Sequence, residues 1–377
     1  MKKISVIFGT RPDAIKLCPL ILAFKKNSGF EVNVCVTGQH RGMLDQVLEV
    51  FEVKPDIDLY LMEDNQTLPS LTSKTIINVN KYLSHYQSDL IIVQGDTTTA
   101  FSSALASFYN KIPIGHVEAG LRTWNKFSPY PEEINRVLIT HIADYHFAPT
   151  KLSKENLVYE GIAEDKIFIT GNPVIDALNL VVNKIRQCPP QIPDLPDYFF
   201  KNPLYPPIVL ITGHRRENFG KRFESICNAV VALADRFNDT EFIYPVHLNP
   251  NVRKPVFRIM SGFKNIHLIE PLKYFSFVAL MDRCKIVLTD SGGVQEEAPS
   301  LGKPVLVMRD TTERPEAIDA GTAKLVGTDT NTIVENVSLL LTDSNAYNMM
   351  AKAVNPYGDG KACERIVAHC KRILTGD

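Results

Sequence analysis

A glycine-containing turn at residues 290–299 has the residue types needed to hold a sugar nucleotide. It lies between two predicted buried strands, and a short helix is predicted to begin within it. A helix start offers unpaired N–H groups and partial positive charge, and Gly292 and Gly293 would let a phosphate approach that backbone closely. Glu296 and Glu297 could accept hydrogen bonds from sugar hydroxyls. The alternative is an ordinary strand-to-helix turn with a glutamate-rich first turn.

Three separate carboxylates in the first half of the chain could work as acids or bases. Asp96 and Glu118 each follow a predicted strand, and Glu132 follows Pro131 at the predicted start of a helix. Each has an ordinary alternative. Asp96 could be a helix N-cap, Glu118 could form a buried salt bridge, and proline with adjacent glutamates is common at helix starts.

Basic side chains in three predicted turns suit an anionic ligand. Arg11 and Lys16, after the first strand, could reach a pyrophosphate, although a solvated helix start is an equal alternative. His214 stands beside two arginines, which suits a diphosphate, and Arg314 is placed for a phosphate or ribose. His247 is better interpreted as structural or peripheral. The sequence contains neither a G-x-G-x-x-G fingerprint nor a P-loop.

Composition narrows the class of protein. The 377 residues suggest two or three domains, and the net charge of −1 gives no basic excess for a nucleic-acid partner. The apolar runs are strand-sized, so no membrane association is expected. Seven scattered cysteines without a C-x-x-C pair indicate reduced thiols in the cytoplasm and no zinc or other metal site.

Short β-branched runs alternate with helical patterns, which predicts an α/β protein with parallel sheets. Two Rossmann-like domains are expected: residues 1–171 with the carboxylates, completed by a terminal helix at 360–377, and residues 172–359 for nucleotide binding. The proline-rich segment 187–207 is irregular surface, and the turn at 171–173 is an equally good boundary. Ligands of open α/β sheets bind outside the carboxyl ends of the strands, so all these motifs could line one interdomain active-site cleft.

Strands are expected at residues 4–8, 31–37, 90–94, 112–117, 145–148, 167–170, 208–212, 241–246, 265–269, 285–289, 305–308 and 323–326.

Together, the motifs resemble those of the bacterial non-hydrolysing UDP-N-acetylglucosamine 2-epimerases, over nearly the whole chain. The matching segments are GTRP at 9–12, GQHR at 38–41, GDTTT at 95–99, GHVEAGLR at 115–122, PEE-x-NR at 131–136, TGHRRE at 212–217, DSGG-x-QEE at 290–297, residues 309–315 and NPYGDG at 355–360.

The resemblance implies a GT-B-like pair of Rossmann-like domains, usually in a homodimer, with UDP-GlcNAc and UDP-ManNAc as substrates and no cofactor. The activity implied is anti elimination of UDP to bound 2-acetamidoglucal, followed by re-addition with inversion at C2. A hydrolysing relative that releases ManNAc and UDP, a GT-B glycosyltransferase and a non-catalytic sugar-nucleotide sensor are the alternatives.

The same resemblance assigns expected roles by motif. The acid and base candidates are Asp96, Glu118 and Glu132, and the resemblance does not decide which of them deprotonates C2. His214 is expected to lie near the leaving diphosphate or to assist proton transfer. The substrate-binding residues implied are Arg11, Lys16, Arg136, Ser291, Gly292, Gly293, Glu297 and Arg314.

Some family members bind a second UDP-GlcNAc as an allosteric activator, for which the candidates here are Gln39, His40 and His247. Those members tend to carry glutamine and arginine where this chain has Gly42 and Asn65. Allosteric activation is therefore left open.

Overall fold

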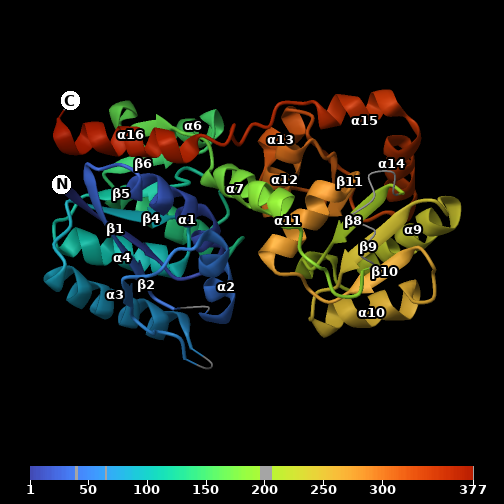
Figure 1. Cartoon of the computed structure of the whole chain (residues 1–377), viewed down its shortest axis with the longest axis horizontal. Coiled ribbons are helices and arrows are strands. Elements are labelled where there is room, and N and C mark those ends of the chain that lie inside the picture. The colour runs from blue at the N-terminus through green and yellow to red at the C-terminus, as the bar shows by residue number, and fades with distance from the viewer. Residues whose placement is uncertain (39–40, 64–65, 196–205, 377) are drawn as a thin grey trace. The chain divides into compact units, whose positions relative to one another are not determined.

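The chain divides into two compact α/β units, coloured along the sequence in Figure 1. One unit comprises Met1–Leu180 and Tyr357–Asp377, and the other comprises Val181–Pro356. Among the residues described, no helix is long and apolar enough to cross a membrane. The computed structural model describes residues 1–38, 41–63, 66–195 and 206–376.

Unit 1 is built on a seven-stranded sheet in the order β3-β2-β1-β4-β5-β6-β7, and every pair of neighbours is parallel. Its central strands carry continuous apolar runs because both faces of the sheet are covered by helices. The strands are β1 (Lys2–Phe8), β2 (Phe30–Val36), β3 (Ile57–Asp58), β4 (Leu90–Gln94), β5 (Ile114–Val117), β6 (Tyr145–Ala148) and β7 (Ile167–Ile169).

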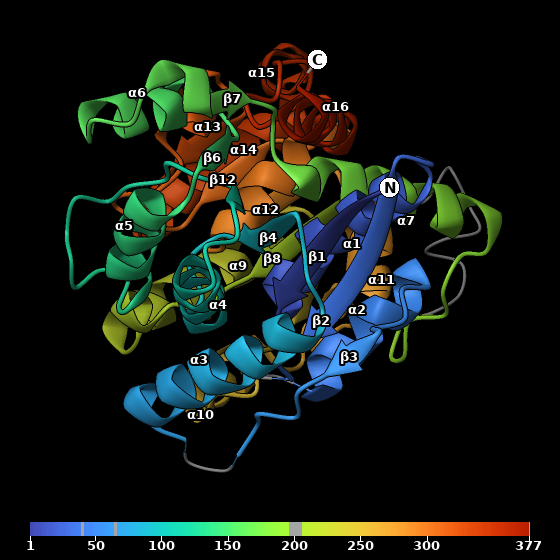
Figure 2. The same cartoon turned by 90° about the vertical axis from the view of Figure 1, so that its left-hand side faces the viewer.

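The helices of unit 1 form two layers. α1 packs against α2 and α16, whereas α3, α4 and α5 form a contiguous layer, as Figure 2 shows. The division between the units falls within α7. The helices are α1 (Arg11–Lys25), α2 (Arg41–Phe51), α3 (Leu68–His85), α4 (Thr98–Tyr109), α5 (Glu132–Ile142), α6 (Lys151–Tyr159), α7 (Pro173–Gln187) and α16 (Ala362–Thr375), with a 3₁₀ turn at Glu164–Lys166.

Unit 2 repeats the plan with a six-stranded parallel sheet in the order β10-β9-β8-β11-β12-β13. Its strands are β8 (Ile208–Thr212), β9 (Glu241–Pro245), β10 (Ile266–Ile269), β11 (Ile286–Thr289), β12 (Val305–Val307) and β13 (Ala323–Leu325). Its helices are α9 (Lys221–Arg236), α10 (Pro250–Met260), α11 (Tyr274–Arg283), α12 (Gly292–Glu297), α13 (Pro315–Asp319), α14 (Thr330–Thr342) and α15 (Ser344–Ala351), with 3₁₀ turns at Arg216–Asn218 and Ala298–Leu301.

Each sheet reverses its strand order once, and this reversal positions the functional loops. In unit 1 it falls between β1 and β4, and in unit 2 between β8 and β11. Loops leaving the carboxyl ends of two such strands diverge and leave a crevice, which is where ligands of open α/β sheets bind. The turns beginning at Gly9 and Gly95 therefore face each other in unit 1, and those at Gly213 and Asp290 do so in unit 2.

The predicted α/β class and parallel sheets are confirmed, with local differences in the elements. The strand predicted at 112–117 begins at Ile114, because Pro113 has no N–H to contribute to the ladder. α6 begins at Lys151, because the side chain of Thr150 accepts a hydrogen bond from Ser153 N and caps the helix. Part of the proline-rich segment, residues 196–205, lies outside the described residues.

A buried carboxylate anchors the terminal helix α16 to unit 1. Asp176 of α7 accepts hydrogen bonds from the backbone N–H groups of Ala362 at 3.1 Å and Cys363 at 2.9 Å. These groups open α16, where intrahelical acceptors are missing. The carboxylate thus takes the place of a cap and ties the end of the chain to α7.

We expect Asp176→Ala to lower the free energy of unfolding by about 2–3 kcal/mol, because two buried N–H groups would lose a charged acceptor. Urea denaturation followed by circular dichroism measures this change. Asp329→Ala, which removes an exposed N-cap from α14, is the control and should cost less. Equal losses in the two variants would contradict the anchoring role.

Candidate functional site

A cavity of about 340 Å³ opens at the strand-order reversal of unit 1. It is lined by the predicted acid and base candidates Asp96, Glu118 and Glu132, together with Lys16 and Asp13. These residues come from four different segments of the chain, which the parallel sheet gathers at one edge. The arrangement brings four carboxyl groups and an ammonium group around a space large enough for a sugar ring.

Glu118 is held in place by three side chains. Its carboxylate accepts hydrogen bonds from Lys16 Nζ and Gln94 Nε2, and from Asn172 Nδ2 at 2.9 Å. Its backbone has φ of 62°, in the left-handed region that few residues other than glycine adopt. Such strain persists only where the surroundings over-determine it, and it clusters at functional sites.

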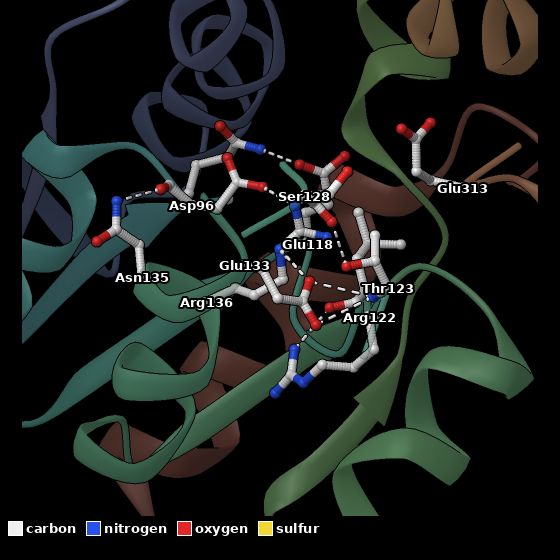
Figure 3. A network of polar contacts seen from close by, with 12 residues as sticks. Asp96, Glu118, Arg122, Thr123, Ser128, Glu133, Asn135, Arg136 and Glu313 are labelled. Carbon is white, nitrogen blue, oxygen red and sulfur yellow. Dashed lines mark hydrogen bonds and ion pairs between the residues drawn. The ribbon is translucent and has the colours of Figure 1, made fainter. Parts of the chain in front are cut away.

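Asp96 is paired with an arginine from a neighbouring helix. Arg136 of α5 contacts the Asp96 carboxylate at 2.7 Å, and Asn135 Nδ2 donates to the Asp96 backbone carbonyl at 2.9 Å (Figure 3). Burial raises the pKa of Asp96, Arg136 opposes this rise, and the negative charge of Glu118 adds to it. Arg136 itself is buried, so its contact with Asp96 is the role the structure shows for it; contact with substrate stays a prediction.

Two adjacent glutamates at the start of α5 have different surroundings. Glu132 lines the cavity, whereas the buried Glu133 accepts hydrogen bonds from the backbone N–H groups of Thr123 at 3.0 Å and Trp124 at 2.9 Å. Glu133 also lies 3.6 Å from Arg136. Glu133 therefore holds the loop that follows β5, and Figure 3 shows this network.

A buried histidine supports the Asp96 turn from within the sheet. His116 Nε2 lies 2.7 Å from the carbonyl oxygen of Gly95. Complete burial lowers the pKa of His116 to about 3, so the ring is neutral at physiological pH and donates from Nε2. Because Gly95 has φ of 66° and precedes Asp96 directly, this bond fixes where the Asp96 side chain begins.

In unit 2, a buried aspartate organises the turn after β8. Asp290 accepts hydrogen bonds from the backbone N–H groups of His214 and Arg215, both at 2.8 Å. Burial lowers the pKa of His214. The neighbouring His247 and Arg215 lower this pKa further, whereas Asp290 opposes the change. The imidazole is therefore neutral near pH 7 and could accept a proton.

Two guanidinium groups converge above Gly292 at the start of α12. A Cβ added to Gly292 would lie 3.8 Å from Arg314 Nη2 and 3.9 Å from Arg215 Nη2. Arg314 is oriented by a hydrogen bond from its Nε to Glu296. Glycine thus leaves the space in which an anion could meet both arginines, with Ser291 and Gly293 on either side.

The remaining predicted residues are placed as follows. Glu297 is buried and accepts a hydrogen bond from Tyr274 Oη at 2.6 Å, and Arg11 opens α1 in a partly buried position. His247 stacks on His214 with ring centroids 5.2 Å apart. Gln39 and His40 lie outside the described residues, so their predicted allosteric role is untested.

Sequence reasoning missed several residues that position these groups. Gln94 and Asn172 both bind Glu118, and Asn172 is 54 positions away from it, so no local pattern could reveal the contact. Asp290 was part of a recognised motif, but its burial was not foreseen. Asp13 carried a signal, because Thr10 and Asp13 have the spacing of a capping box.

Comparison with known proteins identifies the family. The model of the family described as UDP-N-acetylglucosamine 2-epimerase matches residues 22–371. The chain belongs to this family. It is 53% identical to the UDP-N-acetylglucosamine 2-epimerase of Escherichia coli K12 over 370 residues, covering 98% of both chains. The enzyme of Campylobacter jejuni is 49% identical over 379 residues, covering 97% of both chains.

Solved structures of epimerases agree with the fold. The UDP-GlcNAc 2-epimerase of Neisseria meningitidis bound to UDP-GlcNAc is 48% identical, with a TM-score of 0.89, and the match covers 98% of this chain and 100% of that one. A glycosyltransferase of kitacinnamycin has a TM-score of 0.63 at 9% identity, with 99% of each chain covered, and shows the fold alone. The GT-B-like expectation for this epimerase family member is thus confirmed.

The two glutamates of α5 give a matched pair of variants. We expect Glu133→Ala to lower the free energy of unfolding by about 2–4 kcal/mol, because two backbone N–H groups lose their acceptor and Arg136 loses a neighbouring charge. Glu132→Ala should change it by less than about 1 kcal/mol. Urea denaturation of both variants measures the difference, and comparable losses would show that Glu133 does not hold the loop.

Proposed function

We propose that this protein is a non-hydrolysing epimerase that interconverts UDP-GlcNAc and UDP-ManNAc. The observation that carries the proposal is the cavity of unit 1 in which Asp96, Glu118 and Glu132 meet Lys16. A plain nucleotide-binding module has no need of three carboxylates beside a sugar-sized space. The structures of relatives bound to UDP-GlcNAc, from Neisseria meningitidis, and to UDP-GlcNAc and UDP, from Methanocaldococcus jannaschii, support the substrate.

The reaction would proceed by elimination and re-addition. A carboxylate removes the C2 proton while the C1–O bond breaks, so that UDP leaves and a C1–C2 double bond forms in 2-acetamidoglucal. UDP then adds back to C1, and C2 receives a proton on its opposite face. Asp96, Glu118 and Glu132 are the groups that would give and take these protons, and either direction needs one base and one acid.

Unit 2 would bind the nucleotide. Arg215 and Arg314 converge where a diphosphate would meet the backbone of Ser291, Gly292 and Gly293, and Glu297 would accept from the ribose. Negative charge builds on the diphosphate as the C1–O bond breaks, so preorganised positive charge there stabilises the transition state. His214, neutral and beside this turn, would assist the leaving group. Arg11 and Lys16 of unit 1 are also expected to bind UDP.

Further parts of the proposal concern assembly and setting. A homodimer is expected, and α3 and α4 offer exposed apolar side chains for it at Ile77, Phe108 and Tyr109. A cytoplasmic location is expected because all seven cysteines are free. We expect no metal or nicotinamide cofactor to take part in the reaction.

Phosphorus NMR distinguishes this reaction from the hydrolytic alternative. With UDP-GlcNAc as the only substrate, we expect the diphosphate-ester signals of two sugar nucleotides to reach a constant ratio. Free UDP should stay at a trace level set by occasional release of the intermediate. Stoichiometric accumulation of UDP with free ManNAc would identify a hydrolysing enzyme, and an unchanged spectrum would favour a transferase that lacks its acceptor or a sensor.

The carboxylates of unit 1 can be tested separately from nucleotide binding. We expect Asp96→Asn and Glu118→Gln each to lower kcat by about 10²- to 10⁴-fold, the range for loss of an acid or base. Calorimetry should show UDP affinity within about threefold of wild type, because neither Asp96 nor Glu118 is among the residues proposed to contact UDP. Glu164→Gln, at an exposed site paired with Lys154, is the control. Near-normal turnover in either variant would remove that residue from the mechanism.

A further inference from the structure

Asp13 is a buried carboxylate in the cavity wall to which the proposed reaction gives no role. It lies in the first turn of α1 and is only 2% exposed. Its Oδ2 accepts hydrogen bonds from the backbone N–H groups of Thr10 at 3.2 Å and Gly9 at 3.4 Å. These contacts belong to a capping box, and they alone would make Asp13 an ordinary structural residue.

A third contact takes Asp13 beyond capping. Thr97 Oγ1 donates to the same Oδ2 at 3.3 Å. Thr97 follows Asp96 directly and lies across the strand-order reversal, 84 positions from Asp13. Asp13 therefore joins the turn after β1 to the turn that carries a proposed acid or base.

Four other charged side chains line the cavity together with Asp13. Asp96 lies on the turn after β4, Lys16 one helical turn further along α1, Glu118 after β5, and Glu132 at the start of α5. Burial raises the pKa of Asp13 to about 7, the capping hydrogen bonds oppose the rise, and the negative charge of Asp96 adds to it. The charge of Asp13 thus changes in the neutral range, next to Asp96.

We propose that Asp13 is a positioning residue that fixes the Asp96–Thr97 turn and, by its own charge, sets the pH range over which Asp96 works. This proposal rests on the proposed epimerase function and deepens it. When Asp13 is ionised, its negative charge makes ionisation of Asp96 less favourable. When Asp13 is protonated, this repulsion is absent, and Asp96 ionises at a lower pH.

The kinetic test compares Asp13→Asn, Asp13→Ala and Asp13→Glu. Asparagine keeps an oxygen that can accept the capping bonds but removes the charge. We expect it to move the limb of the pH profile of kcat/KM that reports Asp96 to lower pH, by at least about half a unit. Asp13→Ala also loses the link to Thr97, so kcat should fall about 10- to 100-fold with KM nearly unchanged. Asp13→Glu, which restores the charge, should keep the wild-type limb.

Thermal unfolding at pH 5.5 and pH 8.5 tests the placement of Asp13 independently of activity. A carboxyl whose pKa is raised by folding stabilises the protein at low pH and loses that contribution as pH rises through the folded-state value. The Tm of Asp13→Asn minus the Tm of wild type should therefore rise by a few degrees from pH 5.5 to pH 8.5. Asp329→Asn is the matched control: folding lowers the pKa of this exposed cap, so its difference from wild type should be flat over this range.

Each outcome decides between the alternatives. A flat Tm difference for Asp13→Asn would overturn the proposal, since Asp13 would then not titrate as a buried group. If the Tm difference slopes but the pH profile of Asp13→Asn is unmoved, Asp13 is only a helix cap. Should the asparagine variant not fold, the same comparison is made with Asp13→Ala. If the Tm difference slopes but the wild-type protein does not epimerise UDP-GlcNAc, the proposed function is contradicted, and the role of Asp13 in it is contradicted too.

Discussion

The hydrogen bonds to the Glu118 carboxylate are the interactions on which the unit 1 site depends. Lys16, Gln94 and Asn172 donate to it from three different elements. A buried carboxylate is unfavourable unless it is paired and hydrogen-bonded, so these elements must come together for Glu118 to be buried at all. Glu118 has a left-handed backbone, and its side chain lines the cavity. The fold and the arrangement of the site are therefore stabilised by the same contacts.

Both units use one architectural device. In each, a buried aspartate at the strand-order reversal accepts backbone N–H groups from the turn after the first strand: Asp13 in unit 1 and Asp290 in unit 2. The aspartate joins the two turns that flank the crevice, from the β1 side in unit 1 and from the β11 side in unit 2. An open parallel sheet leaves these turns divergent. A carboxylate between them fixes their spacing, which in our proposal determines where sugar and diphosphate are held.

The sequence predicted the elements better than the contacts. Continuous apolar runs identified the central strands because these are covered on both faces. β3 (Ile57–Asp58) was not predicted, because a strand of two residues carries no periodic pattern. Asp96 and Glu118 were named because each follows a strand, and Glu132 because it follows a proline at a helix start. The partners of Glu118 and the burial of Asp13 depend on tertiary packing, and one sequence without structure has no local signal for either. The different surroundings of Glu132 and Glu133 likewise follow from the path of the loop before α5.

The central claim is that a carboxylate of unit 1 removes the proton from C2 of the sugar nucleotide. Proton NMR of UDP-GlcNAc in deuterium oxide tests this most directly. The account predicts that the epimer formed carries deuterium at C2 from its first appearance, and that deuterium then enters C2 of UDP-GlcNAc as the reaction reverses. An epimer that keeps its original C2 proton, or a substrate that exchanges nothing, would contradict the account.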